Sequence, residues 1–317
     1  MSIRTKYQKL VAIVLVICLC VITTVVIGKV LPPSEPKVVW TMVNVNTELQ
    51  GDAHLIQVRR GKTVLIDAGY PQIAQQQLIP FLQTNQIEHL DLVFITHAHQ
   101  DHYGGIKPIL EADIKINEIY FNLPDKKICD REIPWGCNYE EVLTYHQMLK
   151  EHQVKVKSAH PGQAFNLGNN TTLKILYAFD GINTPVGTTD INDMSLIMRL
   201  EHGQHKYLFT GDLNRAIGGY LANHSQELAA DVLDVPHHGT EGVAPNEFFA
   251  RVGAKYALVP SPQSLWCSER SSRIRNWFQD HDIPVFVNGF SGHIRVENYG
   301  NRLKIVPEKE HNSQICT

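Results

Sequence analysis

Seven residues, Thr96 to His102 (THAHQDH), place three histidines and an aspartate in one short segment of the chain. They follow an apolar run from Leu90 to Ile95, which predicts that the segment begins where a buried strand ends. Alternate side chains of extended backbone point to one side, so His97, His99 and Asp101 can converge while His102 adds a second direction. Imidazole and carboxylate ligands together favour zinc or a similar divalent metal. The alternative, a polar surface loop, does not explain four ligand-type residues at one strand end.

The composition is that of a globular protein with a sizeable core. The chain has 317 residues, of which 43% are hydrophobic and 19% are charged, enough for one large domain or two small ones. The formal net charge of -3 gives no general basic field that would hold nucleic acid by electrostatics alone. A local basic groove remains compatible with this charge.

The amino terminus has the pattern of a membrane anchor. Arg4, Lys6 and Lys9 precede an uncharged apolar stretch, 10–28, which as a helix would span roughly 30 Å at about 1.5 Å per residue. A cleaved signal peptide is the alternative and would give a secreted form, but the run is longer than usual and no small-x-small site follows. The basic flank should stay cytoplasmic, which places the rest of the chain outside the inner or plasma membrane. We expect a basic tip and transmembrane anchor (1–29), a proline-rich spacer (30–37) and one domain (38–317), with the membrane as partner and no obligate protein partner evident.

Cysteine usage agrees with an oxidising compartment. Outside the apolar stretch the cysteines are even in number: Cys129, Cys137, Cys267 and Cys316. Cys129 and Cys137 enclose a short loop, and we expect them to form a disulfide. Four free thiols are the alternative.

Short strand-like and helical segments alternate along the globular part. We expect strands at 38–45, 53–59, 63–66, 90–95, 118–121, 172–178, 195–200, 207–210, 232–235, 256–259 and 285–287, and helices at 73–86, 104–112, 140–152, 217–224 and 271–280. Each candidate ligand follows a strand: Asp67, the 97–102 segment, Asp212 and His237. Loops at one edge of a layered structure can bring such distant residues together.

The motifs, taken together, resemble a known family. THAHQDH matches the H-x-H-x-D-H signature of metallo-β-lactamase-fold hydrolases. Over residues 38–300 the chain resembles the hydrolase domain of ComEC-type competence proteins. The strings that carry this resemblance are GDAHLI (51–56), LIDAG (65–69), NDMSLIMRL (192–200), LFTGD (208–212) and VPHHGT (235–240). It implies an α/β fold, the four-layer αβ/βα metallo-β-lactamase sandwich, and the apolar stretch described above would precede this sandwich as one transmembrane helix.

The resemblance also implies a role for individual residues. His97 and His99 would bind one metal ion, Asp101 and His102 a second, and Asp212 would bridge the two. We prefer His237 over His238 as the remaining ligand of the second ion, with His238 contacting substrate; Asp67 would hold a ligand in place. The family's histidine before the bridging aspartate is missing, which leaves an oxygen of Asn192 or Asp193. The candidate catalytic residues are therefore Asp101, Asn192, Ser195 and His238, and the cofactors are two divalent ions, for which zinc is preferred and manganese is the alternative.

Two close metal ions favour hydrolysis of a phosphodiester by an activated water. The substrate could be DNA or an envelope phosphodiester such as a phosphocholine ester. Two other functions remain open: hydrolysis of a β-lactam, lactone or other carbonyl ester, and a membrane-tethered binding protein without catalysis.

Overall fold

The computed structural model describes residues 3, 13, 35–44, 49–133, 136–179, 190–310 and 316. Pro36–Thr317 forms one compact unit, with which the following account is concerned. Apart from Ile13, the predicted anchor lies outside the described residues. Among the residues that the structure does describe, none of the helices combines the length and apolar character needed to cross a bilayer.

The unit contains two sheets. The first has the order β15-β14-β1-β2-β3-β4-β5-β6. Its strands are β1 (Val38–Met42), β2 (His54–Val58), β3 (Thr63–Ile66), β4 (His89–Ile95), β5 (Lys115–Phe121), β6 (Lys155–Lys157), β14 (Ile294–Asn298) and β15 (Leu303–Pro307). β3 to β6 are parallel, whereas β1, β2, β14 and β15 pair antiparallel.

The second sheet has the order β13-β12-β11-β10-β9-β8-β7. Its strands are β7 (Ala164–Gly168), β8 (Thr171–Tyr177), β9 (Ile197–His202), β10 (His205–Phe209), β11 (Val232–Asp234), β12 (Tyr256–Val259) and β13 (Val285–Val287). β10 to β13 are parallel, and β7 to β10 form an antiparallel meander.

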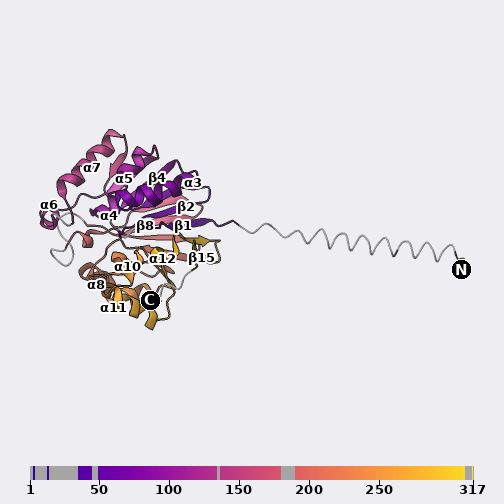
Figure 1. Cartoon of the computed structure of the whole chain (residues 1–317). Helices are drawn as coiled ribbons and strands as arrows, with labels where there is room; N and C mark the ends of the chain where they lie inside the picture. Colours follow the sequence, from indigo (N-terminus) through magenta and orange to yellow (C-terminus); the bar gives the residue numbers. More distant parts are fainter. Residues whose placement is uncertain are drawn as a thin grey trace. The chain divides into compact units, whose positions relative to one another are not determined.

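Helices cover the outer face of each sheet, as Figure 1 shows. On the first sheet lie α2 (Pro71–Ile73), the π-helical η1 (Ala74–Leu78), α3 (Ile79–Thr84), α4 (Gln100–Tyr103), α5 (Ile106–Glu111), α6 (Lys126–Cys129), η2 (Asp130–Glu132) and α7 (Tyr139–Glu151). With the second sheet go α8 (Arg215–His224), η4 (Pro236–Gly239), α9 (Asn246–Val252), α10 (Gln263–Trp266), η5 (Glu269–Ser271), α11 (Ser272–Asp280) and α12 (Asn288–Ser291). The short η3 (Asn192–Met194) precedes β9, and its Met194 packs in the apolar cluster of the first sheet.

Three apolar clusters hold the layers together. One lies between the two sheets and includes Trp40, Phe94 and Phe209. The others lie between each sheet and its helices. β4 pairs with a parallel strand on each side and has apolar neighbours on both faces, which explains its nearly continuous apolar sequence. The predicted four-layer αβ/βα sandwich is confirmed.

The carboxyl ends of β3, β4, β10 and β11 lie at the same edge of the sandwich, and the polar segments of the sequence follow these ends. Two glycines permit the close packing there. A Cβ on Gly211 would lie 2.8 Å from Thr96 Oγ1, and one on Gly105 would lie 2.1 Å from the Ala68 carbonyl oxygen. Lack of space thus excludes a side chain at both positions, and Gly211 also has a φ of 46°, which favours glycine.

Candidate metal centre

One group of ligand-type side chains comes from three separate loops. Asp101 and His102 lie in α4 after β4, Asp212 follows β10, and His238 lies in η4 after β11. His102 Nε2 is 3.3 Å from Asp212 Oδ1. His238 Nε2 is 3.5 Å from the same oxygen and 3.3 Å from Asp101 Oδ2. All four side chains are buried.

A second group shares Asp212 with the first. His97 Nε2 faces His99 Nδ1 at 3.1 Å and lies 3.9 Å from Asp212 Oδ2. Asp212 therefore turns one carboxylate oxygen toward each group. This is the arrangement of a bridging ligand, and the structure brings together the predicted residues His97, His99, Asp101, His102 and Asp212.

The ligand atoms that face one another in the first group are placed for binding a divalent metal ion and not for hydrogen bonding to each other. His102 Nε2, His238 Nε2 and Asp212 Oδ1 are buried, and within the described residues none of them has a hydrogen-bond partner. Ligands at about 2.0–2.1 Å from a tetrahedral ion lie roughly 3.3 Å apart, close to the separations in the first group. Unpaired buried polar atoms are costly, so a cation among them would resolve both their spacing and their lack of partners.

The charges of the group lead to the same conclusion. Burial alone would raise the pKa of Asp212, but His238, His102 and His237 outweigh it and hold this pKa well below the usual range. Burial alone would lower the pKa of His102, yet Asp212 and Asp67 raise it well above its ordinary value. The buried carboxylates thus demand compensating positive charge, which divalent cations can supply.

Outer partners fix the orientation of the ligand rings. Asp67 accepts hydrogen bonds from the backbone N–H and the hydroxyl of Thr96, at 2.8 and 2.7 Å, and its Oδ2 lies 2.8 Å from His102 Nδ1. The pKa of Asp67 is raised by burial. Asp67 itself has a φ of 56°, a left-handed conformation that is uncommon outside glycine. It occupies the supporting position that the sequence indicated.

Ser195 differs from its expected catalytic role. Its side chain is fully buried, its hydroxyl accepts a hydrogen bond from the Asp212 backbone N–H at 3.0 Å, and it lies 3.3 Å from His97 Nδ1. Ser195 is not among the residues that line the pocket over the ligands. The structure therefore gives it a position that holds His97 and Asp212, away from substrate.

The preference for His237 over His238 as a ligand is not what the geometry supports. His238 Nδ1 is 3.0 Å from the Pro260 carbonyl oxygen, which leaves Nε2 facing Asp101 and Asp212. His237 Nδ1 instead lies 2.8 Å from Asn214 Oδ1, and its Nε2 is 4.0 Å from Asp212. Both residues have a φ of 52°, so the backbone turns between them and sends their rings in different directions. His238 belongs to the first group, and His237 lines the pocket.

Of the two residues left open by the missing histidine, Asn192 is the one at the site. It lines the pocket, and its Oδ1 is buried without a hydrogen-bond partner among the described residues. Asp193 turns away: its Oδ1 accepts a hydrogen bond from the Asn214 backbone N–H at 3.1 Å. Burial, aided by Asp190, raises the pKa of Asp193 to about 7.

Two residues near the ligands had no assigned role in the sequence interpretation. Asp52 Oδ1 lies 3.3 Å from His238 Nδ1, and its Oδ2 lies 3.9 Å from His102 Nδ1. Glu132 Oε2 lies 2.7 Å from His99 Nε2. Asp52 belongs to the GDAHLI string, which could have drawn attention to it. Glu132 lies in no motif and follows no strand, so the sequence carried no comparable signal.

Of the ligand residues, His99, Asp101 and Asp212 line an open pocket of about 570 Å³. Its lining is mostly polar: Gln50, Tyr70, His99, Gln100, Asp101, Ile133, Gly136, Cys137, Asn138, Glu141, Asn192, Asp212, His237 and Arg270. Burial raises the pKa of Tyr70 to about 12, so this side chain offers a hydroxyl donor at neutral pH. Arg270 lies at the rim and pairs with Glu241 at 2.9 Å.

Comparisons with known proteins confirm the resemblance to metallo-β-lactamase-fold hydrolases of the ComEC type. The model of the Metallo-beta-lactamase superfamily matches residues 46–118. ComE operon protein 3 of Bacillus subtilis is 27% identical over 275 residues, which cover 80% of this chain and 32% of that protein. Endoribonuclease ysh1 of Schizosaccharomyces pombe is 26% identical over 100 residues, 31% of this chain and 13% of that protein. The chain thus spans a third or less of the length of these relatives.

A solved structure supports the fold alone. CmlA, a diiron β-hydroxylase from Streptomyces venezuelae, superposes with a TM-score of 0.52 at 12% sequence identity, covering 84% of this chain and 55% of that one. Its likeness is one of architecture, and at this identity it does not extend to the reaction.

Proposed function

We propose that this chain, a metal-dependent hydrolase of the metallo-β-lactamase fold, cleaves phosphodiester bonds. The observation that carries the proposal is the position of Asp212, which turns one oxygen toward each of two ligand groups at the floor of an open pocket. Two ions held on either side of one carboxylate suit in-line displacement at phosphorus. Zinc fits the imidazole and carboxylate donors, and manganese is the alternative.

Divalent ions at this site would supply a water of lowered pKa and positive charge for the oxygens of the reacting phosphate. The protein's own residues do the rest. Asp101, His102 and His238 would hold one ion, His97, His99 and Asn192 would hold the other, and Asp212 would join the two sites. Because His237 Nδ1 donates to Asn214 Oδ1, its Nε2 faces the pocket without a hydrogen and can accept one from a water or a hydroxyl of the substrate.

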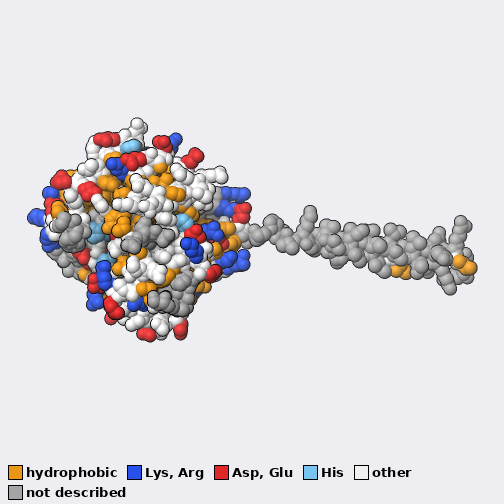
Figure 2. All heavy atoms as spheres, viewed as in Figure 1, with side chains coloured by type: hydrophobic (Ala, Val, Ile, Leu, Met, Phe, Trp, Pro, Cys, Tyr) orange, Lys and Arg blue, Asp and Glu red, His pale blue; other side chains and the backbone are white. Residues whose placement is uncertain are grey.

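The pocket supports a phosphodiester over a β-lactam. Its lining is rich in amide, carboxylate and imidazole groups, with Arg270 at the rim, and Ile133 is its one large aliphatic side chain among the described residues. The face in Figure 2 mixes acidic and basic side chains and shows no broad basic area. The name of one relative, an endoribonuclease, favours a nucleic acid over an envelope phosphodiester.

Residues 10–28 would anchor the domain to a membrane, with residues 36–317 on the extracytoplasmic side. The apolar stretch and its basic flank support this placement. Two disulfides, Cys129–Cys137 and Cys267–Cys316, accord with an oxidising compartment. The first was expected and the second was not.

The test of the reaction uses the full chain in detergent with added Zn²⁺ or Mn²⁺. We expect hydrolysis of bis-p-nitrophenyl phosphate and of DNA, and none of nitrocefin. Asp212→Ala should lose both ions and reduce turnover by more than about 100-fold, because this side chain serves both groups. Hydrolysis of nitrocefin alone would establish the carbonyl reaction instead. Two bound ions without turnover of any substrate would favour a binding protein.

A further inference from the structure

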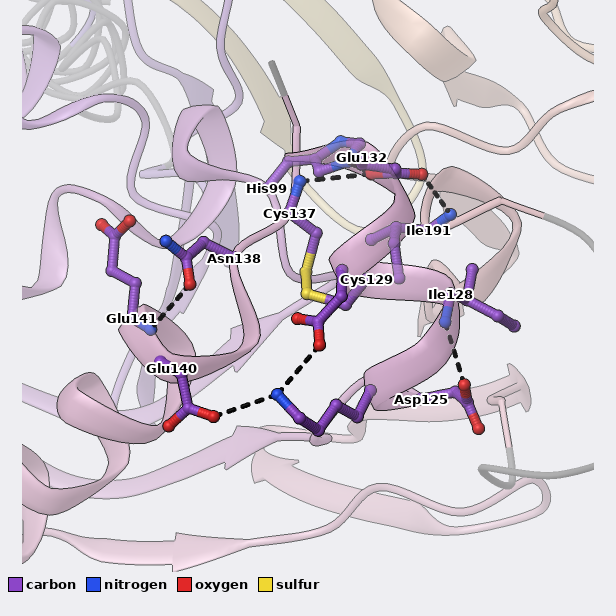
Figure 3. The surroundings of a disulfide bond; sticks show 12 residues. His99, Asp125, Ile128, Cys129, Glu132, Cys137, Asn138, Glu140, Glu141 and Ile191 are labelled. Atoms are coloured by element: carbon purple, nitrogen blue, oxygen red, sulfur yellow. Dashed lines mark hydrogen bonds and ion pairs between the residues drawn. A yellow bond between two sulfur atoms is a disulfide. The ribbon is translucent and has the colours of Figure 1, made fainter. Parts of the chain in front are cut away.

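A small disulfide-closed loop forms one wall of the pocket. Cys129 ends α6, η2 follows, and the bond from Cys129 to Cys137 closes the loop over a separation of eight residues. Pro134 and Trp135 lie outside the described residues. Gly136 and Cys137 line the pocket, while both cysteine side chains are buried in the core cluster under the helices of the first sheet. Figure 3 shows this loop beside His99.

Glu132 connects the loop to the metal centre. Its carboxylate is buried, with 6% of the side chain exposed. Oε2 lies 2.7 Å from His99 Nε2 and accepts a hydrogen bond from the Cys137 backbone N–H at 3.2 Å. Oε1 accepts from the Ile191 backbone N–H at 3.2 Å. In Figure 3 the carboxylate lies between His99 and Ile191, so one side chain joins the loop, a ligand ring and the segment that leads to Asn192.

The contact with Glu132 determines which ring nitrogen of His99 is available to bind a metal ion. A carboxylate only accepts hydrogen bonds, so His99 Nε2 must carry the proton that it shares with Glu132. The lone pair is then on Nδ1, the atom that faces His97 Nε2 at 3.1 Å. Glu132 thus does for His99 what Asp67 does for His102. Asp67 stands at the end of a core strand, whereas Glu132 stands on a peripheral loop that a disulfide closes.

We propose that Glu132 is the positioning residue of His99 and that the Cys129–Cys137 disulfide keeps it in place, which makes metal binding at the His97–His99 group dependent on that disulfide. The inference rests on the proposed metal centre and not on the identity of the substrate. Reduction by a dithiol transfers two electrons and two protons, breaks the S–S bond, leaves two thiols and converts the dithiol to a disulfide. The freed loop would then withdraw the carboxylate from His99, while the Asp101–His102–Asp212–His238 group keeps its ligands.

The first experiment measures metal affinity directly. Metal-free full-length protein in detergent is titrated with Zn²⁺ against a chelating dye, for the wild type, Glu132→Gln and Glu132→Ala. We expect two ions in the wild type and a 10- to 100-fold weaker affinity for one of them in the variants. Alanine should have the larger effect, because the glutamine amide oxygen can still accept from His99. The affinity of the other ion should not change.

The visible spectrum of bound Co²⁺ reports on each metal site separately. A general loss of stability would affect both sites, whereas loss of the Glu132 contact should affect only one. With Co²⁺ in place of Zn²⁺, the visible bands of one of the two ions should change in Glu132→Gln and those of the other should not. Thermal unfolding of the metal-free variants checks that they fold. Glu132→Gln preserves the shape of the buried side chain and serves if Glu132→Ala does not fold.

The second experiment uses the other disulfide as a matched control. Cys129→Ala/Cys137→Ala should weaken the same ion as Glu132→Ala does, and Cys267→Ala/Cys316→Ala should bind both ions as the wild type does. Alanine avoids new thiol ligands. A dithiol reductant added to the Cys267→Ala/Cys316→Ala protein should reproduce the loss, and reoxidation should restore it.

Wild-type affinity for both ions in Glu132→Ala would overturn the proposal. So would normal binding in Cys129→Ala/Cys137→Ala, since the disulfide would then not hold the carboxylate. Because no substrate is involved, failure of the proposed phosphodiesterase activity would leave this result readable.

Discussion

At the scale of single residues, the contrast between His237 and His238 shows how much the backbone decides. The two are adjacent in sequence and of the same type, yet only His238 turns a buried nitrogen toward Asp101 and Asp212. His237 is the more exposed of the pair and is anchored by Asn214. A sequence identifies the pair as a candidate, but the left-handed turn between them is what selects the ligand.

Replacing His237 or His238 by alanine should therefore affect the number of bound ions and the turnover differently. His238→Ala removes a ligand of the first group and should leave about one ion per chain with little turnover. His237→Ala should keep two ions and lower turnover by about 10² to 10³, the usual effect of removing one hydrogen-bonding group from a reacting centre. Elemental analysis beside a rate measurement makes the comparison. Loss of an ion in His237→Ala, with both retained in His238→Ala, would restore the original assignment.

At the scale of elements, helix α7 carries a half-buried histidine, His146, whose protonation makes the stability of the fold depend on pH. His146 packs against Phe121 with ring centroids 4.8 Å apart, and its Nε2 is buried with no hydrogen-bond partner in the described part of the chain. Burial, helped by Lys150, lowers the pKa of His146 from 6.5 to about 4. The folded protein thus binds this proton less tightly than the unfolded chain, so stability is full above pH 6.5 and falls as the pH drops toward 4.

Replacement of this histidine should remove that part of the acid sensitivity. Between pH 7 and pH 4.5, His146→Gln should lose about 2 kcal/mol less stability than the wild type, a value reduced for the partial exposure of the ring. Denaturant unfolding at the two pH values measures this difference. His160→Gln, at an exposed position, is the matched control and should follow the wild type. Equal losses in all three proteins would show that His146 is not responsible.

The sequence predicted best the strands whose apolar run begins and ends abruptly. β3, β12 and β13 have the predicted bounds, and each is a short apolar run. β6, β7, β14 and β15 were missed, because their alternating or partly exposed residues give a weak signal. The ligand loops were predictable since each follows a strand, whereas Glu132 contacts His99 from a loop that follows no strand and that a disulfide closes. Long-range placement of this kind leaves no periodic trace in the chain.

At the scale of the whole molecule, the compact unit and the apolar amino terminus suggest separable tasks. Pro36–Thr317 contains both sheets, both disulfides and every ligand residue of the candidate centre. The proposed anchor would then determine where the hydrolase acts, and the unit would determine what it does.

This division can be tested in bacterial spheroplasts. The full chain should sediment with membranes, and protease added outside should digest the domain, because the basic flank before residue 10 holds the amino terminus inside. A variant beginning at Pro36 behind a cleavable export signal should be soluble and should bind two ions with both disulfides formed. Immunoblotting of fractions, elemental analysis and mass spectrometry of unreduced peptides give the three readouts. If the domain is protected from protease in intact spheroplasts but digested after lysis, it lies in the cytoplasm and the proposed topology is wrong. The domain would then also lack the oxidising environment that forms the Cys129–Cys137 disulfide, on which the proposed control of His99 through Glu132 depends.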